Sequence, residues 1–159
     1  MIIYIYFIII YIIIFDRNMN RQTKRRQKHP YQYQPTPPSY YHNSEYSLEI
    51  RDSTIKEAGL GVFAKAPIPA GTFIDEYKGD YFKRPTSRYY IAITDDLGID
   101  AGSYPRCYMG MLNDVIGSRN EYNCEFLVNV EEKRVRVWST REILAGEELF
   151  ISYGNEYWK

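Results

Sequence analysis

Histidine and cysteine are scarce in this chain of 159 residues. The only histidines are His29 and His42, so residues 46–159 contain none, which excludes a Ser-His or Cys-His catalytic pair in that part. The two cysteines, Cys107 and Cys124, are too few for a disulfide framework or a zinc site of four cysteines. We therefore expect a reducing intracellular setting. Proton or charge chemistry must fall to tyrosine, carboxylates or water.

A hydrophobic run long enough to span a membrane is also lacking. Residues 2–15 are fourteen isoleucines, tyrosines and phenylalanines, whereas a spanning helix needs about 20 apolar residues. A secretory signal carries positive charge before its apolar run, and here the charge follows, at Arg17–Lys28. If the run did insert, that charge would hold the following domain on the cytoplasmic side.

Another interpretation of residues 1–18 is favoured, in which they are not translated. Isoleucine, tyrosine and phenylalanine can all be encoded by A and T alone, so the run reads as AT-rich upstream sequence, with Met19 rather than Met1 as the true start. Membrane anchoring by residues 2–15 is then not expected. The predicted localisation is the nucleus or the cytoplasm.

Residues 19–45 have the composition of a flexible arm. The cluster Arg21–Lys28 is either a nuclear-localisation or nucleic-acid patch or simply a solvated segment, and His29–Ser47 is rich in proline, tyrosine and glutamine without periodicity. No direct nucleic-acid role is predicted beyond this arm. The remaining part, residues 46–159, carries fourteen basic against eighteen acidic side chains, which mildly favours a basic partner.

Residues 46–159 are predicted to form one mostly β domain. No segment has the period of a long amphipathic helix, and Val135 and Val137 alternate with Arg134 and Arg136 as in a half-exposed strand. Short apolar runs separated by Gly, Pro and Asp recur at Ser47–Ile50, Gly61–Ala64, Thr72–Tyr77, Tyr89–Thr94, Ile99–Ala101, Cys124–Val130 and Arg134–Ser139.

Two similar phrases each end in a tyrosine near a glycine. Residues 68–71 (IPAG) lead to Tyr77 before Gly79, and residues 143–146 (ILAG) lead to Tyr153 before Gly154. Each phrase predicts a turn followed by an apolar strand, so two phenols could converge on one pocket. The alternative is that turn, strand and glycine are ordinary β patterning, with Leu149–Ile151 as a closing strand.

The order of four motifs resembles the SET-domain protein lysine methyltransferases over about residues 47–158. The motifs are Gly59-Leu60-Gly61, Tyr77-Lys78-Gly79, Asn113 with the later Asn123-Cys124, and Glu147-Glu148-Leu149 leading to Tyr153. The resemblance implies a mostly β SET-type fold of several short curved sheets (a β-clip) with a C-terminal pseudoknot. In brevity and in its ending, the chain is most similar to the compact SET proteins of large DNA viruses.

The resemblance implies S-adenosyl-L-methionine as cofactor and a role for each matching residue. Tyr153 would be the catalytic tyrosine and Tyr77 would line the lysine channel, with Tyr89 or Tyr90 beside it. Ile151 lies where relatives have Phe or Tyr, and its lack of a hydroxyl predicts product beyond monomethyl-lysine. The cofactor would be held by Gly59, Leu60, Gly61, Asn113, Asp114, Tyr153 and Trp158.

The implied activity is methylation of a lysine in a basic peptide, with a histone tail as the expected substrate. Deprotonating a lysine at pH 7 costs about 4.6 kcal/mol, so the enzyme needs an apolar, aromatic channel rather than a strong base. One alternative is a non-catalytic SET-like module that binds a basic peptide. A second alternative is methylation of a non-histone protein.

Three positions depart from the family pattern. Asp114 replaces a histidine, Gly110 an arginine, and Cys107 an asparagine that often contacts the cofactor. The cysteine-rich zinc segment of many relatives has no counterpart here, and no metal is expected. We instead expect Tyr157 and Trp158 to fold back as a wall of the cofactor pocket, or a second copy of the chain, as a homodimer, to complete it.

Overall fold

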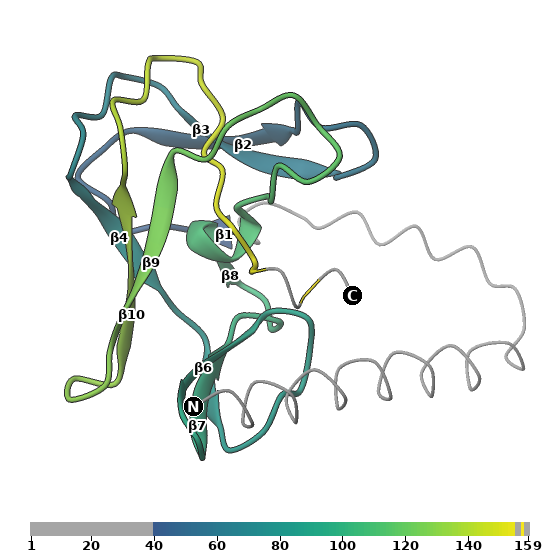
Figure 1. Ribbon diagram of the computed structural model, residues 1–159, viewed down its shortest axis with the longest axis vertical. Coiled ribbons are helices and arrows are strands. Elements are labelled where there is room, and N and C mark those ends of the chain that lie inside the picture. The colour runs from purple at the N-terminus through teal and green to yellow at the C-terminus, as the bar shows by residue number, and fades with distance from the viewer. Residues whose placement is uncertain (1–39, 155–156, 158–159) are drawn as a thin grey trace, which may run out of the picture.

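The computed structural model describes residues 40–154 and residue 157. This part of the chain consists mainly of short strands, arranged in four small sheets (Figure 1). The predicted mostly β, SET-type architecture is thereby confirmed. The one helix among the described residues is the 3₁₀ helix η2, which spans Tyr108–Met111.

The sheets surround the centre of the molecule on several sides. An antiparallel pair joins β2 (Leu48–Asp52) to β3 (Leu60–Ala64). A second sheet has the order β4 (Phe73–Tyr77), β10 (Arg134–Ser139), β9 (Cys124–Asn129). A third has the order β5 (Asp80–Phe82), β7 (Leu97–Asp100), β6 (Tyr90–Thr94). The fourth pairs β1 (Tyr40–Tyr41) in parallel with β8 (Arg106–Cys107).

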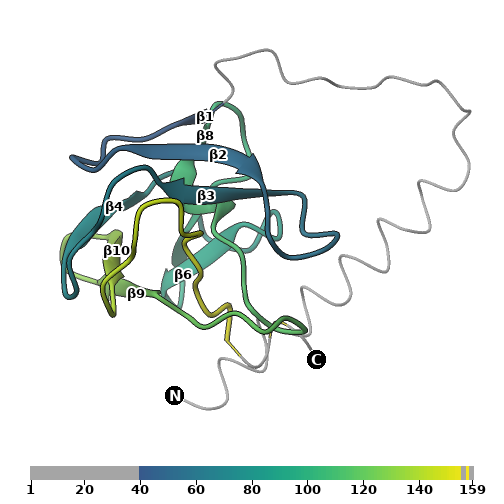
Figure 2. The same cartoon turned by 90° about the horizontal axis from the view of Figure 1, so that it is seen from above.

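The views of Figures 1 and 2 show how these sheets are placed. The β2–β3 pair lies at the top in Figure 1 and β6 with β7 at the bottom. From above, β1 with β8 and the β2–β3 pair lie on one side of the molecule, and β9 and β6 lie on the other (Figure 2). In Figure 1, η2 and the C-terminal segment lie between the upper pair and the lower sheet.

Strands with a clear apolar pattern form where the sequence predicts them, whereas strands of two or three residues have no recognisable pattern in the sequence. The predicted alternation in β10 is confirmed, since Val135, Val137 and Ser139 are buried and Arg134 is exposed. Burying each valine contributes about 1.5–3 kcal/mol. By contrast β1, β5 and β8 have no signal in the sequence, and β1 lies upstream of residue 46, where no strand was expected.

The two similar phrases of the sequence pair directly with each other. Ile68 and Ile143 form an antiparallel bridge, and each donates its N–H to the carbonyl of the other at 2.9 Å. The glycines that end the two turns, Gly71 and Gly146, have φ of +67° and +84°, where side chains are disfavoured. The repeat therefore brings the starts of both tyrosine-bearing segments to one place.

The C-terminal segment does not form the regular closing strand that the sequence suggested. Instead its residues make isolated bridges to three separate segments: Glu148 with Phe63, Phe150 with Asn113, and Ile151 with Cys124. Because these bridge partners lie on both sides of the C-terminal segment, the segment cannot continue as one strand of a regular β-ladder. Residues 148–153 are held between residues 112–114 and 122–124, which is the C-terminal pseudoknot expected from the resemblance.

Among residues 40–154 and 157, no helix is long and apolar enough to cross a membrane. The apolar run of residues 2–15 lies outside the described part of the chain, as does the rest of residues 1–18.

Candidate active site

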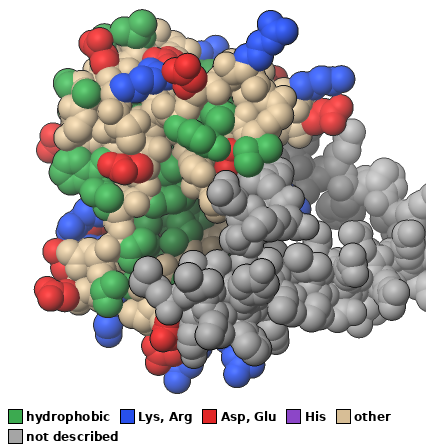
Figure 3. Space-filling view, in the orientation of Figure 1, with side chains coloured by type: hydrophobic (Ala, Val, Ile, Leu, Met, Phe, Trp, Pro, Cys, Tyr) green, Lys and Arg blue, Asp and Glu red, His purple; other side chains and the backbone are tan. Residues whose placement is uncertain are grey.

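A cavity of about 660 Å³ opens between the β2–β3 loop, the start of β6 and the C-terminal segment. Further lining comes from η2, from the residues after it and from β9. Five of the lining residues are tyrosines: Tyr77, Tyr89, Tyr90, Tyr153 and Tyr157. On the face shown in Figure 3, hydrophobic side chains gather in the hollow between the upper and lower parts of the molecule.

Tyr153 is fixed at the cavity by its backbone and its hydroxyl. Its N–H donates to Oδ2 of Asp114 at 2.7 Å, and its hydroxyl donates to the carbonyl of Leu112 at 2.6 Å. The Tyr157 ring contacts it edge-on, with 4.8 Å between ring centroids. Burial, and then the nearby Tyr157 and Asp114, raise the pKa of the phenol well above its usual 10. Tyr153 is therefore a neutral hydrogen-bonding group at pH 7, not a phenolate base.

Tyr77 presents the second phenol to the same cavity. Its side chain is only 5% exposed and its hydroxyl donates to the carbonyl of Tyr89 at 2.6 Å. The Phe126 ring packs against it edge-on at 5.6 Å. Burial is also the main cause that raises the pKa of this phenol above its usual value. The two tyrosines that the sequence repeat singled out thus line one cavity in their neutral form.

Tyr89 and Tyr90, between which the sequence could not choose, both line the cavity. Tyr89 accepts the Tyr77 hydroxyl through its carbonyl, while its ring stacks under the Arg106 guanidinium at 3.8 Å. Ile151, predicted to face the lysine channel, is 1% exposed and lies outside the cavity lining.

The Gly59-Leu60-Gly61 turn contributes to the site in two ways. Leu60 lines the cavity, and Gly59 has a φ of +78° with open space where a Cβ would lie. Gly61 serves packing instead, because a Cβ there would lie 2.1 Å from Oε1 of Glu148. The glycines were expected to allow close approach of the cofactor. At Gly61 the close neighbour is a carboxylate of the protein itself.

Glu148 is a structural residue of the site, although its sequence motif alone indicates no role for it. It is 2% exposed, and its carboxylate accepts four hydrogen bonds at 2.6–3.1 Å. The donors are the Ser53 hydroxyl, the Thr54 N–H and hydroxyl, and Nδ2 of Asn113. This carboxylate therefore ties the β2–β3 loop to the Asn113 segment underneath the cavity. Its position directly after Glu147 in the fourth motif was the only available signal.

Replacing Glu148 with glutamine should lower the free energy of unfolding by about 2–3 kcal/mol. In either orientation the glutamine amide would turn its N–H groups toward the Thr54 N–H or toward the Asn113 Nδ2, neither of which can accept a hydrogen bond. Urea denaturation measures the loss. The control is Glu147→Gln, since Glu147 is half-buried and pairs with Arg141, so its loss should stay below about 1 kcal/mol. Equal losses in the two variants would contradict the role of Glu148.

Asn113 and Asp114 are both engaged within the protein. The Asn113 amide donates to the carbonyl of Leu60 at 3.0 Å as well as to Glu148. The Asp114 carboxylate accepts hydrogen bonds from the N–H groups of Ile116 and Tyr153 and from the Tyr122 hydroxyl, at 2.7–3.0 Å. A neutral histidine has only one acceptor nitrogen. Aspartate at this position therefore matches the three donors, and both residues also line the cavity.

The other two departures have different surroundings. Cys107 is buried, and its thiol exchanges hydrogen bonds with the backbone N–H and carbonyl of Lys78, at 3.3 and 3.1 Å, outside the cavity lining. Gly110 lines the cavity, and a Cβ there would lie 3.0 Å from Cβ of Ala101 and 3.4 Å from Cγ of Arg106. The Arg106 side chain therefore packs beside position 110, and its guanidinium donates to the carbonyls of Ala101 and Gly102.

Of the two aromatic residues expected to close the pocket, Tyr157 lines the cavity and Trp158 lies outside the described residues. Within the described part of the chain, no three His, Cys, Asp or Glu side chains come together as metal ligands.

Comparison with known families gives one result for this chain. The family model described as the SET domain matches residues 59–154, a span that contains all the cavity tyrosines except Tyr157. A comparison with curated proteins finds no significant match.

Proposed function

This chain belongs to the SET-domain family, and on that premise we propose that it is an S-adenosylmethionine-dependent protein lysine N-methyltransferase. The observation that carries the proposal is the placement of the Tyr77 and Tyr153 phenols at one aromatic cavity beside the Gly59–Gly61 turn. The closer resemblance of this chain to the compact SET proteins of large DNA viruses stays a prediction.

The cavity fits the cofactor that this family uses. Its volume of about 660 Å³ lies within the roughly 300–1,000 Å³ of small-molecule sites. Gly59 leaves open space where a side chain would project. Leu60, Asn113, Asp114 and Tyr153, which all line the cavity, would hold the cofactor. When bound, it supplies an electrophilic methyl group for transfer to an amine.

The protein contributes to the reaction by positioning the reacting groups and by removing water from the substrate amine. The aromatic walls from Tyr77, Tyr89, Tyr90 and Phe126 disfavour an ammonium ion deprived of water, which promotes the neutral lysine that can attack. The phenol oxygens of Tyr77 and Tyr153 each keep lone pairs for an approaching N–H or polarised methyl group, because both hydroxyls donate to backbone carbonyls. Holding the reacting atoms in line then removes orientational entropy from the barrier.

The proposed substrate is a lysine in a basic peptide, with a histone tail as the expected case. The excess of acidic side chains in residues 46–159 supports a basic partner. A nuclear or cytoplasmic location would accompany this substrate.

A second candidate function is a non-catalytic module that binds a basic peptide. The residues Cys107, Gly110 and Asp114 favour it, because each departs from the pattern of the catalytic family. The engagement of Asp114 with the Tyr153 backbone weighs against it, because that contact holds the catalytic candidate at the cavity.

Incubation of the full chain with radiolabelled S-adenosylmethionine and core histones tests the proposal. We expect a labelled histone lysine, and mass spectrometry of the labelled peptide reports how many methyl groups it carries. Peptide binding without any methyl transfer would support the binding module instead. Labelling confined to other proteins of a cell extract would support a non-histone substrate.

The pH dependence follows from the state of the two phenols. Because burial raises the pKa of both Tyr77 and Tyr153 above 10, they stay protonated from pH 7 to 9. Only the substrate lysine then loses a proton in this range, so kcat/KM should rise about tenfold per pH unit. Initial rates on a short lysine peptide measure the profile. A falling limb below pH 9 would contradict neutral phenols as the working form.

A further inference from the structure

Four charged side chains line the candidate cavity, and three of them are already engaged. Lys56 and Glu57 form an ion pair at 3.8 Å, and Asp114 accepts the three hydrogen bonds described above. The fourth, Arg88, makes no hydrogen bond or ion pair with any residue of the described chain. Arg88 is exposed, so water solvates its guanidinium, and the five donors of that group can be offered to a ligand at the cavity wall.

The backbone on both sides of Arg88 is fixed. The Ser87 hydroxyl donates to Asp100 at 2.6 Å and accepts the Tyr89 N–H at 3.0 Å. The Tyr89 carbonyl accepts both the Tyr77 hydroxyl at 2.6 Å and the Ala101 N–H at 3.2 Å. Arg88 therefore extends from a fixed point, which lowers the entropic cost of binding an anion there.

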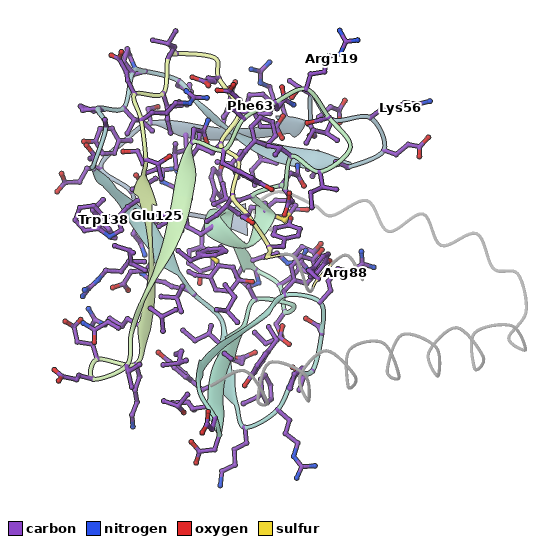
Figure 4. All side chains as sticks on the ribbon, viewed as in Figure 1. Lys56, Phe63, Arg88, Arg119, Glu125 and Trp138 are labelled. Carbon is purple, nitrogen blue, oxygen red and sulfur yellow. The ribbon has the colours of Figure 1, made fainter. Side chains whose placement is uncertain are left out.

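The carboxylate that holds the neighbouring Ser87, that of Asp100, is already engaged with other groups. Asp100 is buried and accepts hydrogen bonds from the hydroxyls of Thr86 and Ser87 and from the N–H of Gly102. Lys56 is a poorer alternative cation for a ligand in the cavity, because it already pairs with Glu57 and its side chain extends away from the fold (Figure 4). Figure 4 places Arg88 between the upper sheets and the lower β6–β7 sheet.

We propose that Arg88 binds the carboxylate of the amino-acid half of the cofactor, an inference that rests on the proposed function. Guanidinium and carboxylate match in a two-pronged, charge-assisted geometry, and the cofactor brings a carboxylate whichever peptide is methylated. Lys83 and Arg84 belong to the same β5–β6 loop but do not line the cavity. Arg88 is thus the cation of this loop that is placed to select amino-acid-bearing nucleosides.

The test is a comparison of two ligands on the full chain by calorimetry. S-Adenosylhomocysteine has the carboxylate, and 5′-methylthioadenosine lacks the whole amino-acid group. Arg88→Gln should weaken S-adenosylhomocysteine about tenfold and leave methylthioadenosine unchanged. Arg88→Lys should retain part of the affinity, because lysine keeps the positive charge but lacks the two-pronged geometry of the guanidinium. Arg84→Gln, which removes a cation from the same loop, should alter neither ligand.

The outcomes separate this inference from the proposed function. Equal weakening of both ligands by Arg88→Gln, or no weakening of S-adenosylhomocysteine, would overturn the role of Arg88. Unchanged cofactor affinity with a raised peptide KM would overturn it in favour of a substrate contact. If neither ligand binds the unmodified chain, the proposed function itself fails, and the inference fails with it.

Discussion

Replacing Tyr153 with phenylalanine should lower kcat about a hundredfold, which corresponds to about 2.7 kcal/mol of barrier. The hydroxyl that lies against the Leu112 carbonyl at 2.6 Å is removed, so the group proposed to align methyl and amine is lost. The fold should survive, because one hydrogen bond contributes only about 1 kcal/mol. Steady-state rates and circular dichroism of the purified variant together measure both effects.

Tyr81→Phe is the matched control for this prediction. The Tyr81 hydroxyl also donates to a backbone carbonyl, that of Lys133 at 2.9 Å, but Tyr81 does not line the candidate cavity. Its loss should leave kcat unchanged. A correctly folded Tyr153→Phe variant with the turnover of the unmodified chain would remove Tyr153 from the mechanism.

Replacing Gly61 with alanine should destabilise the protein by about 3 kcal/mol. The added Cβ would lie 2.1 Å from Oε1 of Glu148 and 3.3 Å from Nδ2 of Asn113. Relieving that clash must displace the buried carboxylate from its four donors, and with it the loop that lines the cavity. A thermal melt should show a drop of about 10 °C, and S-adenosylhomocysteine binding should weaken in parallel.

Gly59→Ala separates crowding from backbone strain. A Cβ at Gly59 would meet no atom within 4 Å, but its φ of +78° disfavours any side chain. We expect a loss of about 1 kcal/mol, clearly smaller than at Gly61. If both substitutions cost the same, the Glu148 contact is not the reason for glycine at position 61.

Local patterns in the sequence determined the fold class and the candidate phenols. The alternation of Val135 and Val137 with arginines depends only on neighbours along one strand, so β10 was predictable. Tyr77 and Tyr153 were found because each follows a turn with a glycine in the left-handed region, and such turns depend on a few adjacent residues. The SET resemblance rests on the same kind of short, ordered motifs.

Only the tertiary structure decided which polar and apolar residues of those motifs face the cavity. Ile151, predicted in the channel, is buried beside it, whereas Arg88, given no role from the sequence, lines it. Glu148 meets Ser53 and Thr54 across 95 and 94 positions of the chain. Hydrogen bonds weaken within a few tenths of an ångström. Whether such distant groups meet therefore depends on how separate sheets pack, and a pattern of neighbouring residues does not contain that information.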